Sequence, residues 1–180
     1  MAEHRSDPRN EARRLTAFHE AGHALATMRW RGPFAYVTIE GQACVVGRAD
    51  DNAANAITAW AFGESELTAR EVRIWLAGLA GESICTGAPP WRIVALGFPD
   101  EIPFDDRAED DVPQARARLL REHPALDARE LAARLLAEYE IVRAFLERHR
   151  AVLETVATAL EREGRLDYER VRALVGRELS

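Results

Sequence analysis

The chain has 180 residues, of which 47% are hydrophobic and 30% charged, and its formal net charge is -6. This length and balance indicate one compact domain and exclude a disordered chain. The acidic balance argues against a nucleic-acid partner, because phosphate recognition needs a concentrated positive face. No stretch approaches the roughly 18 apolar residues of a membrane helix, and the polar N-terminal segment lacks the apolar core of a secretory signal. We therefore expect a cytoplasmic protein with no membrane anchor in the chain.

All 24 basic residues are arginine, and lysine is absent. A P-loop places its lysine on the nucleotide phosphates, so these residues cannot form a standard Walker A site. Lysine Schiff-base chemistry is excluded for the same reason. The two cysteines, Cys44 and Cys85, are too few for a disulfide framework and too far apart in sequence for a zinc-thiolate pair. We interpret them as free thiols.

The first predicted element is a helix over residues 8–30, in which apolar and small residues recur at three and four positions and a Gly-Pro pair follows. Residues 34–39 are rich in β-formers and predict a strand. Residues 43–47 predict another strand, so that the two form a hairpin or two exposed strands. We assign residues 1–9 to a flexible N-terminal segment and residues 10–180 to one domain.

A strongly apolar helix is predicted from Thr68 to Ile84, with Ser65 or Thr68 as its N-cap. Its small residues are Ala77, Gly78, Ala80 and Gly81. A glycine inside a helix costs about 1 kcal/mol relative to alanine, so we attribute these residues to the close approach of another helix.

The rest of the chain is predicted to be one irregular stretch followed by helices. The irregular stretch is the proline-rich segment 86–108. Helices are expected over about 110–122, 127–148, 150–163 and 167–178, with Asp167 as the cap of the last. The predicted fold class is mainly α, a helical bundle with a small β-element after the first helix.

The first predicted helix contains His19-Glu20-Ala21-Gly22-His23. Residues four apart lie on one helix face, so His19 and His23 can bind one metal ion together. Glu20 lies on the flank of that face, where it can act as a general base without being a ligand. Zinc lowers the pKa of a bound water to near 7, so this H-E-x-x-H pattern predicts metal-dependent hydrolysis. The apolar flanks of the motif argue against a pair of solvated histidines.

A catalytic zinc needs a third protein ligand and one open position. The residues alone leave several candidates open: Glu82, Asp105, Asp106, Glu109, Asp110, Asp111, His123 and His149. The metal is open as well, because two histidines and a carboxylate also hold iron and other divalent ions.

The segment 16–26, TAFHEAGHALA, closely resembles the zinc-helix signature of the FtsH family peptidase domain, the proteolytic part of AAA-type ATP-dependent zinc metalloproteases. Residues 36–39 with Gly47 are similar to the family's edge strand. Residues 76–84 are similar to its small-residue helix, and the tail from Glu138 onward to its closing helices. The resemblance covers about residues 10–176 and implies an FtsH-like zinc peptidase fold, as a stand-alone domain.

The resemblance also implies the third ligand. In the family, this ligand is an aspartate in an Asn-Asp-Leu turn that opens a helix, and Asp110-Asp111-Val112 is similar to that turn. The role therefore falls on Asp111, with Asp110 as an alternative. A carboxylate at a helix start, near a proline in the first turn, is favoured by the helix dipole and held by a rigid backbone. Glu82 is the second choice, either as a ligand or as an acceptor for a histidine N–H.

Several features depart from the family pattern. These residues contain neither the ATPase module nor the membrane anchor that normally precede the domain. The stretch 88–109 is longer than the family's loop, Leu79 replaces its arginine, and Ser83 replaces its second glutamate. We therefore expect the substrate to be a peptide or an unfolded protein segment. Self-association and a separate ATPase partner remain open.

The predicted function is that of a zinc-dependent (Zn2+) metallopeptidase, an endopeptidase with His19, His23 and Asp111 as ligands and Glu20 as general base. The alternative from another class is a catalytically silent, metal-binding FtsH-peptidase-like module with an interaction or regulatory role. Glu20 argues against it, because a structural zinc needs no base. A third reading, a peptidase dedicated to one regulator, is disfavoured by the FtsH-like middle and tail.

Overall fold

The computed structural model describes residues 8–39, 64–90, 93 and 111–179. In chain order the elements are α1 (Pro8–Trp30), β1 (Tyr36–Thr38), α3 (Glu64–Thr86), α5 (Asp111–Glu122), α6 (Ala128–Arg148), α7 (Arg150–Glu163), β2 (Arg165–Asp167) and α8 (Tyr168–Val175). The prediction of a mainly α fold with a small β-element is confirmed. Within the described part of the chain, no helix is long and apolar enough to cross a membrane.

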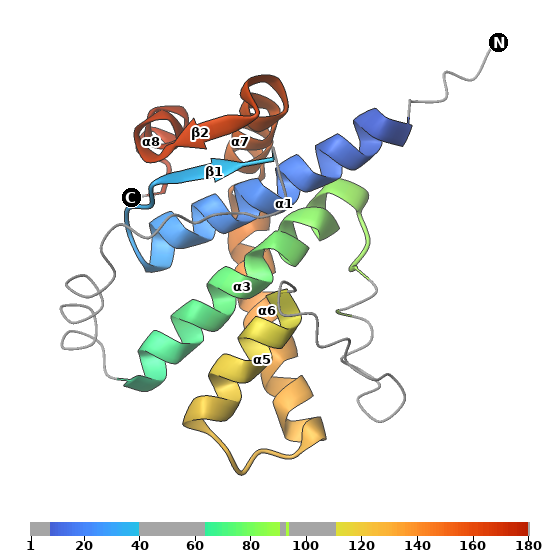
Figure 1. Cartoon of the computed structure of the whole chain (residues 1–180), viewed down its shortest axis with the longest axis vertical. Helices are drawn as coiled ribbons and strands as arrows, with labels where there is room; N and C mark the ends of the chain where they lie inside the picture. Colours follow the sequence, from blue (N-terminus) through green and yellow to red (C-terminus); the bar gives the residue numbers. More distant parts are fainter. Residues whose placement is uncertain (1–7, 40–63, 91–92, 94–110, 180) are drawn as a thin grey trace.

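The helix pair α1 and α3 forms the centre of the molecule, and the two run side by side in Figure 1. A Cβ atom on Gly22 would lie 2.3 Å from the Ala77 carbonyl oxygen, and one on Gly81 would lie 2.2 Å from the Phe18 carbonyl oxygen. Backbone atoms cannot move aside, so glycine is required at both positions. The close approach predicted from the small residues of the second helix is confirmed.

The predicted start of this second helix is wrong. α3 begins at Glu64, so Ser65 and Thr68 both lie inside the helix and neither is its N-cap. Thr68 is buried against the core. The predicted boundary, based on apolar spacing, is therefore about one turn too late.

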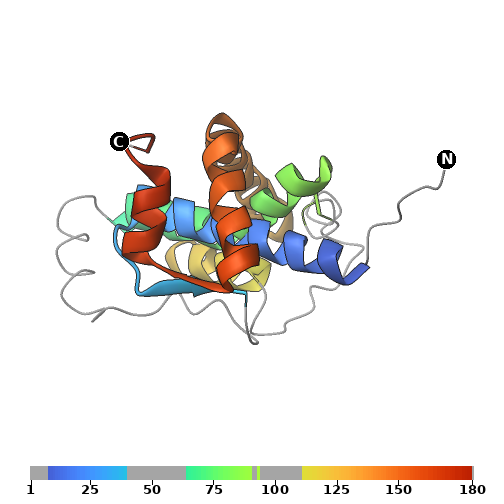
Figure 2. The same cartoon turned by 90° about the horizontal axis from the view of Figure 1, so that it is seen from above.

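The remaining helices pack around the central pair. α5 and α6 contact α3, and α7 crosses α1 at a steep angle (Figure 2). Ion pairs connect two of these helices to α3. Arg73 Nε on α3 lies 2.6 Å from Glu138 Oε2 on α6, and Arg118 on α5 pairs with Glu71 on α3. The largest fully buried side chains are Tyr139, Leu25, Leu76, Leu79, Leu135, Leu146, Leu153, Leu160 and Leu166, together with Val37 and Val72.

The small sheet joins distant parts of the chain. β1 pairs antiparallel with β2, with Val37 opposite Leu166. The Thr38 hydroxyl donates to the Gly164 carbonyl at 3.0 Å, and the Arg165 guanidinium lies 3.6 Å from the centre of the Tyr36 ring. The predicted strand partner, residues 43–47, lies outside the described residues, as do residues 1–7 and most of the stretch 86–108. The pairing with β2 ties the end of α1 to the last two helices.

The last helices begin where the sequence predicts. Asp127 caps α6 and accepts a hydrogen bond from the Glu130 amide, while the Glu130 side chain accepts one from the Asp127 amide, which completes a capping box. The Asp167 side chain accepts from the Arg170 amide at the start of α8. The cap predicted at Asp167 is therefore confirmed.

Candidate metal centre

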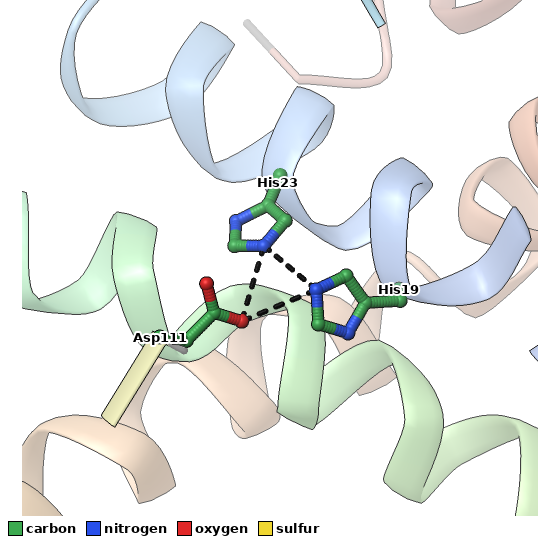
Figure 3. Close-up of side chains that lie close together, drawn as sticks. All are labelled: His19, His23 and Asp111. Carbon is green, nitrogen blue, oxygen red and sulfur yellow. Dashed lines mark hydrogen bonds and ion pairs between the residues drawn. The ribbon is translucent and has the colours of Figure 1, made fainter. Parts of the chain in front are cut away.

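α1 and the first residue of α5 bring three side chains together, as Figure 3 shows. His19 and His23 lie one turn apart on α1, and their Nε2 atoms are 3.1 Å apart. Asp111 Oδ2 lies 3.2 Å from His19 Nε2 and 3.3 Å from His23 Nε2. Among the described residues, these three form the group that can hold a metal ion. The three ligands expected from the sequence thus converge on one point.

The outer nitrogen of each imidazole has its own hydrogen-bond acceptor on α3. His19 Nδ1 lies 2.7 Å from Glu82 Oε1, and His23 Nδ1 lies 2.8 Å from the Ile74 carbonyl oxygen. A carbonyl oxygen only accepts, and a carboxylate accepts when ionised, so each Nδ1 is assigned as the donor. In the neutral form of each ring, which is the form that binds a metal, Nε2 then has its lone pair available on the side that faces Asp111. Outer partners of this kind orient histidines that ligate metals.

The spacing of the three atoms fits a small divalent ion. Ligand atoms held about 2.05 Å from a tetrahedral zinc ion lie about 3.3 Å from one another. The observed separations are 3.1, 3.2 and 3.3 Å. Two imidazole nitrogens and one carboxylate oxygen are also a donor set that zinc accepts, and three protein ligands leave a tetrahedral ion one open position.

The charges of the metal-free site favour a cation. Burial lowers the pKa of His19, but hydrogen bonds to Asp111 and Glu82 outweigh burial and raise that pKa to about 10. For Asp111, burial opposes ionisation, but the charge of His23 and hydrogen bonds from both histidines hold its pKa below the usual value. Without a metal, the carboxylates therefore keep a proton on His19. A bound ion would take the place of that positive charge.

Glu20 is buried beside this group, with 6% of its surface exposed. Its Oε2 atom is buried and has no hydrogen-bond partner among the described residues. Its charge is one of those that raise the pKa of His19, which places the carboxylate near the histidines. A buried carboxylate oxygen without a partner is costly, so its position requires a reason such as binding to a water or a ligand.

The other candidate ligands are away from this group or outside the described residues. Glu82 lies against the outer nitrogen, Nδ1, of His19. Its geometry therefore matches the role of an acceptor for a histidine N–H and not that of a metal ligand. His149 packs against Phe145, with ring centres 5.0 Å apart. His123 lies 3.9 Å from Glu122 at the end of α5. Asp105, Asp106, Glu109 and Asp110 lie outside the described residues.

Two contributions of α3 could not be assigned from the sequence. The Ile74 carbonyl has no signal in the sequence, because any residue supplies a backbone oxygen. The small-residue pattern predicts a role in helix packing for Gly78, but a Cβ atom there would meet the two imidazoles. Only the geometry of both helices together identifies these contacts.

Comparison with known proteins finds no family model that matches the chain. No curated protein matches it either.

Proposed function

We propose that this chain is a zinc metallopeptidase that hydrolyses peptide bonds in peptides or unfolded protein segments. The observation that carries the proposal is the convergence of His19 Nε2, His23 Nε2 and Asp111 Oδ2 within 3.3 Å of one another, with both outer imidazole nitrogens engaged by acceptors. This arrangement matches what a three-ligand zinc site requires in donor type, spacing and tautomer.

The roles of the side chains follow from their positions. His19, His23 and Asp111 would hold the ion. When bound, zinc supplies a Lewis acid that polarises a carbonyl and lowers the pKa of water at the open position. Glu20 would take a proton from the attacking water and pass it to the leaving amine. Its buried Oε2, without a partner among the described residues, is available for this transfer.

The same features argue against a catalytically silent module. A structural zinc site is closed by four protein ligands, whereas the group in the described residues supplies three. A structural site also gains nothing from a buried carboxylate next to its ligands, which instead adds a desolvation cost. The position of Glu20 therefore supports the hydrolytic function.

We also propose membership of the FtsH peptidase family, on the likeness of the HEAGH helix, of the small-residue helix and of the turn at Asp111. The 180 residues contain no lysine and hence no Walker A motif. Peptides and unfolded segments are the substrates proposed, because folded proteins would require a separate ATPase to unfold them. Self-association and such an ATPase partner are parts of the proposal left to experiment.

The test combines metal content with cleavage. We expect one zinc per chain by mass spectrometry, and zinc-dependent cleavage of casein, an unstructured protein. Glu20→Gln should retain the zinc and lose at least about 100-fold in rate, because it removes the base and none of the ligands. Glu140→Gln, at an exposed position on α6, is the matched control and should cleave at the normal rate.

Two results would change the conclusion. Zinc retained without cleavage of any unstructured substrate would support the silent binding module. Cleavage that persists in Glu20→Gln would remove Glu20 from the role of general base.

A further inference from the structure

Gly78 faces the metal centre from α3. A Cβ atom at this position would lie 2.4 Å from His19 Nε2, 2.5 Å from His19 Cε1 and 2.6 Å from His23 Nε2. Non-bonded carbon and nitrogen atoms do not approach this closely, since the attractive minimum lies near 3.5–4.0 Å. Figure 3 shows the ribbon of α3 passing beside the three labelled side chains. Glycine therefore leaves free the space in which the two imidazoles converge.

The contacts of Gly78 differ from those of the other glycines in the helix pair. The nearest atoms to a Cβ on Gly22 or Gly81 belong to the backbone of the partner helix. The three nearest atoms at Gly78 all belong to imidazole rings. Gly22 and Gly81 thus determine how closely α1 and α3 approach, whereas Gly78 determines where the ligand side chains lie.

Gly78 also lies midway between the two acceptors that orient the histidines. Ile74 precedes it by one helical turn and accepts from His23, and Glu82 follows it by one turn and accepts from His19. Residues at this spacing share one face of a helix. One face of α3 therefore carries the Ile74 carbonyl, the free space at Gly78 and the Glu82 carboxylate in that order. The two histidines that contact this face are also one turn apart.

We propose that Gly78 is a positioning residue of the metal centre: its missing side chain allows His19 Nε2 and His23 Nε2 to approach the same ion. The inference rests on the proposed metal-binding function. It concerns assembly of the ligand set and not the proteolytic step. A side chain as small as a methyl group would push the two nitrogens away from each other or from Asp111.

The test is Gly78→Ala, read by metal binding. We expect the zinc affinity to fall about 100-fold, the upper range for residues that orient ligands. We also expect the tetrahedral cobalt(II) absorption of the wild-type protein to be lost. Far-ultraviolet circular dichroism should stay unchanged, because the clash is with side chains. Gly81→Ala is the matched control: it meets α1 backbone and should lower the melting temperature of the metal-free protein more than Gly78→Ala does.

Gly78→Ala with wild-type zinc affinity and an unchanged cobalt spectrum would overturn the inference. If Gly78→Ala does not fold, the same substitution is made in a His19→Ala, His23→Ala background. Recovery of folding there supports the inference, because the obstructing rings are gone, and continued failure to fold overturns it.

The two proposals can fail separately. Zinc bound by the wild type but not by Gly78→Ala, without cleavage in either, supports the inference and contradicts the peptidase. Zinc bound with equal affinity by the wild type and Gly78→Ala, with Glu20-dependent cleavage in both, supports the peptidase and overturns the inference. If the wild type binds neither zinc nor cobalt, both proposals are overturned.

Discussion

The two histidines of the candidate metal centre donate from Nδ1 to different kinds of acceptor. The acceptor is the Glu82 carboxylate for His19 and the Ile74 backbone carbonyl for His23. Only the first can be changed by substitution. Glu82→Ala leaves His19 Nδ1 without its acceptor and should lower zinc affinity about 10- to 100-fold. Glu82→Gln keeps an acceptor oxygen but loses the charge, so its affinity should lie between those of Glu82→Ala and the wild type. Competition with a chelator of known affinity measures all three.

The control for this prediction is Glu138→Gln, also at a partly buried glutamate but one that pairs with Arg73 away from the histidines. It should bind zinc as the wild type does. Equal affinities for Glu82→Ala and the wild type would show that Glu82 does not orient the ligand.

The proton that His19 carries in the metal-free site should make the zinc affinity depend on pH. The raised pKa of His19, about 10, means that this imidazole is protonated at neutral pH when no metal is bound. Zinc needs the neutral ring and must displace the proton, so zinc affinity should rise with pH between pH 6 and pH 9, about tenfold per unit for one proton. Calorimetry in two buffers of different ionisation enthalpy should detect about one proton released per zinc. Affinity that is flat over this range would contradict the assignment.

At the scale of the secondary-structure elements, α5 determines the position of the third ligand. Its buried residues Val112, Ala115 and Leu119 recur along one face, and Asp111 is its first residue. Leu119→Ala should reduce the free energy of unfolding by about 2–5 kcal/mol, through lost burial and a cavity under this helix. Zinc affinity should fall as well, because the carboxylate is then less firmly placed. Urea denaturation and the chelator assay measure the two effects.

Ala117→Ser on the exposed face of α5 is the control and should change neither quantity by much. A Leu119→Ala protein that is destabilised but binds zinc normally would show that Asp111 is placed by its immediate neighbours alone.

At the scale of the whole molecule, zinc would connect α1 to α5, two elements that are distant in the sequence. An ion that binds only the folded state stabilises it by about 2.7 kcal/mol at 100 times its dissociation constant. For a chain of this size, each kcal/mol raises the melting temperature by about 2–4 °C, so a shift of about 5–11 °C is expected. Differential scanning calorimetry with and without chelator tests this. His23→Ala should show no shift, and an equal shift in that variant would place the bound zinc elsewhere.

The helices and the histidine pair could largely be anticipated from the sequence, because both depend on local spacing. The third candidate ligand, Asp111, is expected only from the resemblance to the FtsH peptidase family, because spacing alone leaves eight residues open. Residues 8–30 and 150–163 show the helical period, and the His19–His23 separation is one turn. What could not be predicted depends on contacts between elements. The pairing of β1 with β2 joins residues more than a hundred positions apart and has no local signal. Glu82 had two open roles, and only its distance from His19 Nδ1 distinguishes them.

The pairing of β1 with β2 also bears on the order in which the protein folds during synthesis. All three candidate metal ligands have left the ribosome once residue 111 has emerged. The helix that carries two of them, however, packs against α7, and the strand that follows it pairs with residues 165–167. Neither contact is available to the nascent chain until most of it has been made. We therefore expect a fragment that ends after α5 to bind zinc weakly. The full zinc affinity of the candidate site should be reached only when the last helices have packed against α1 and β1.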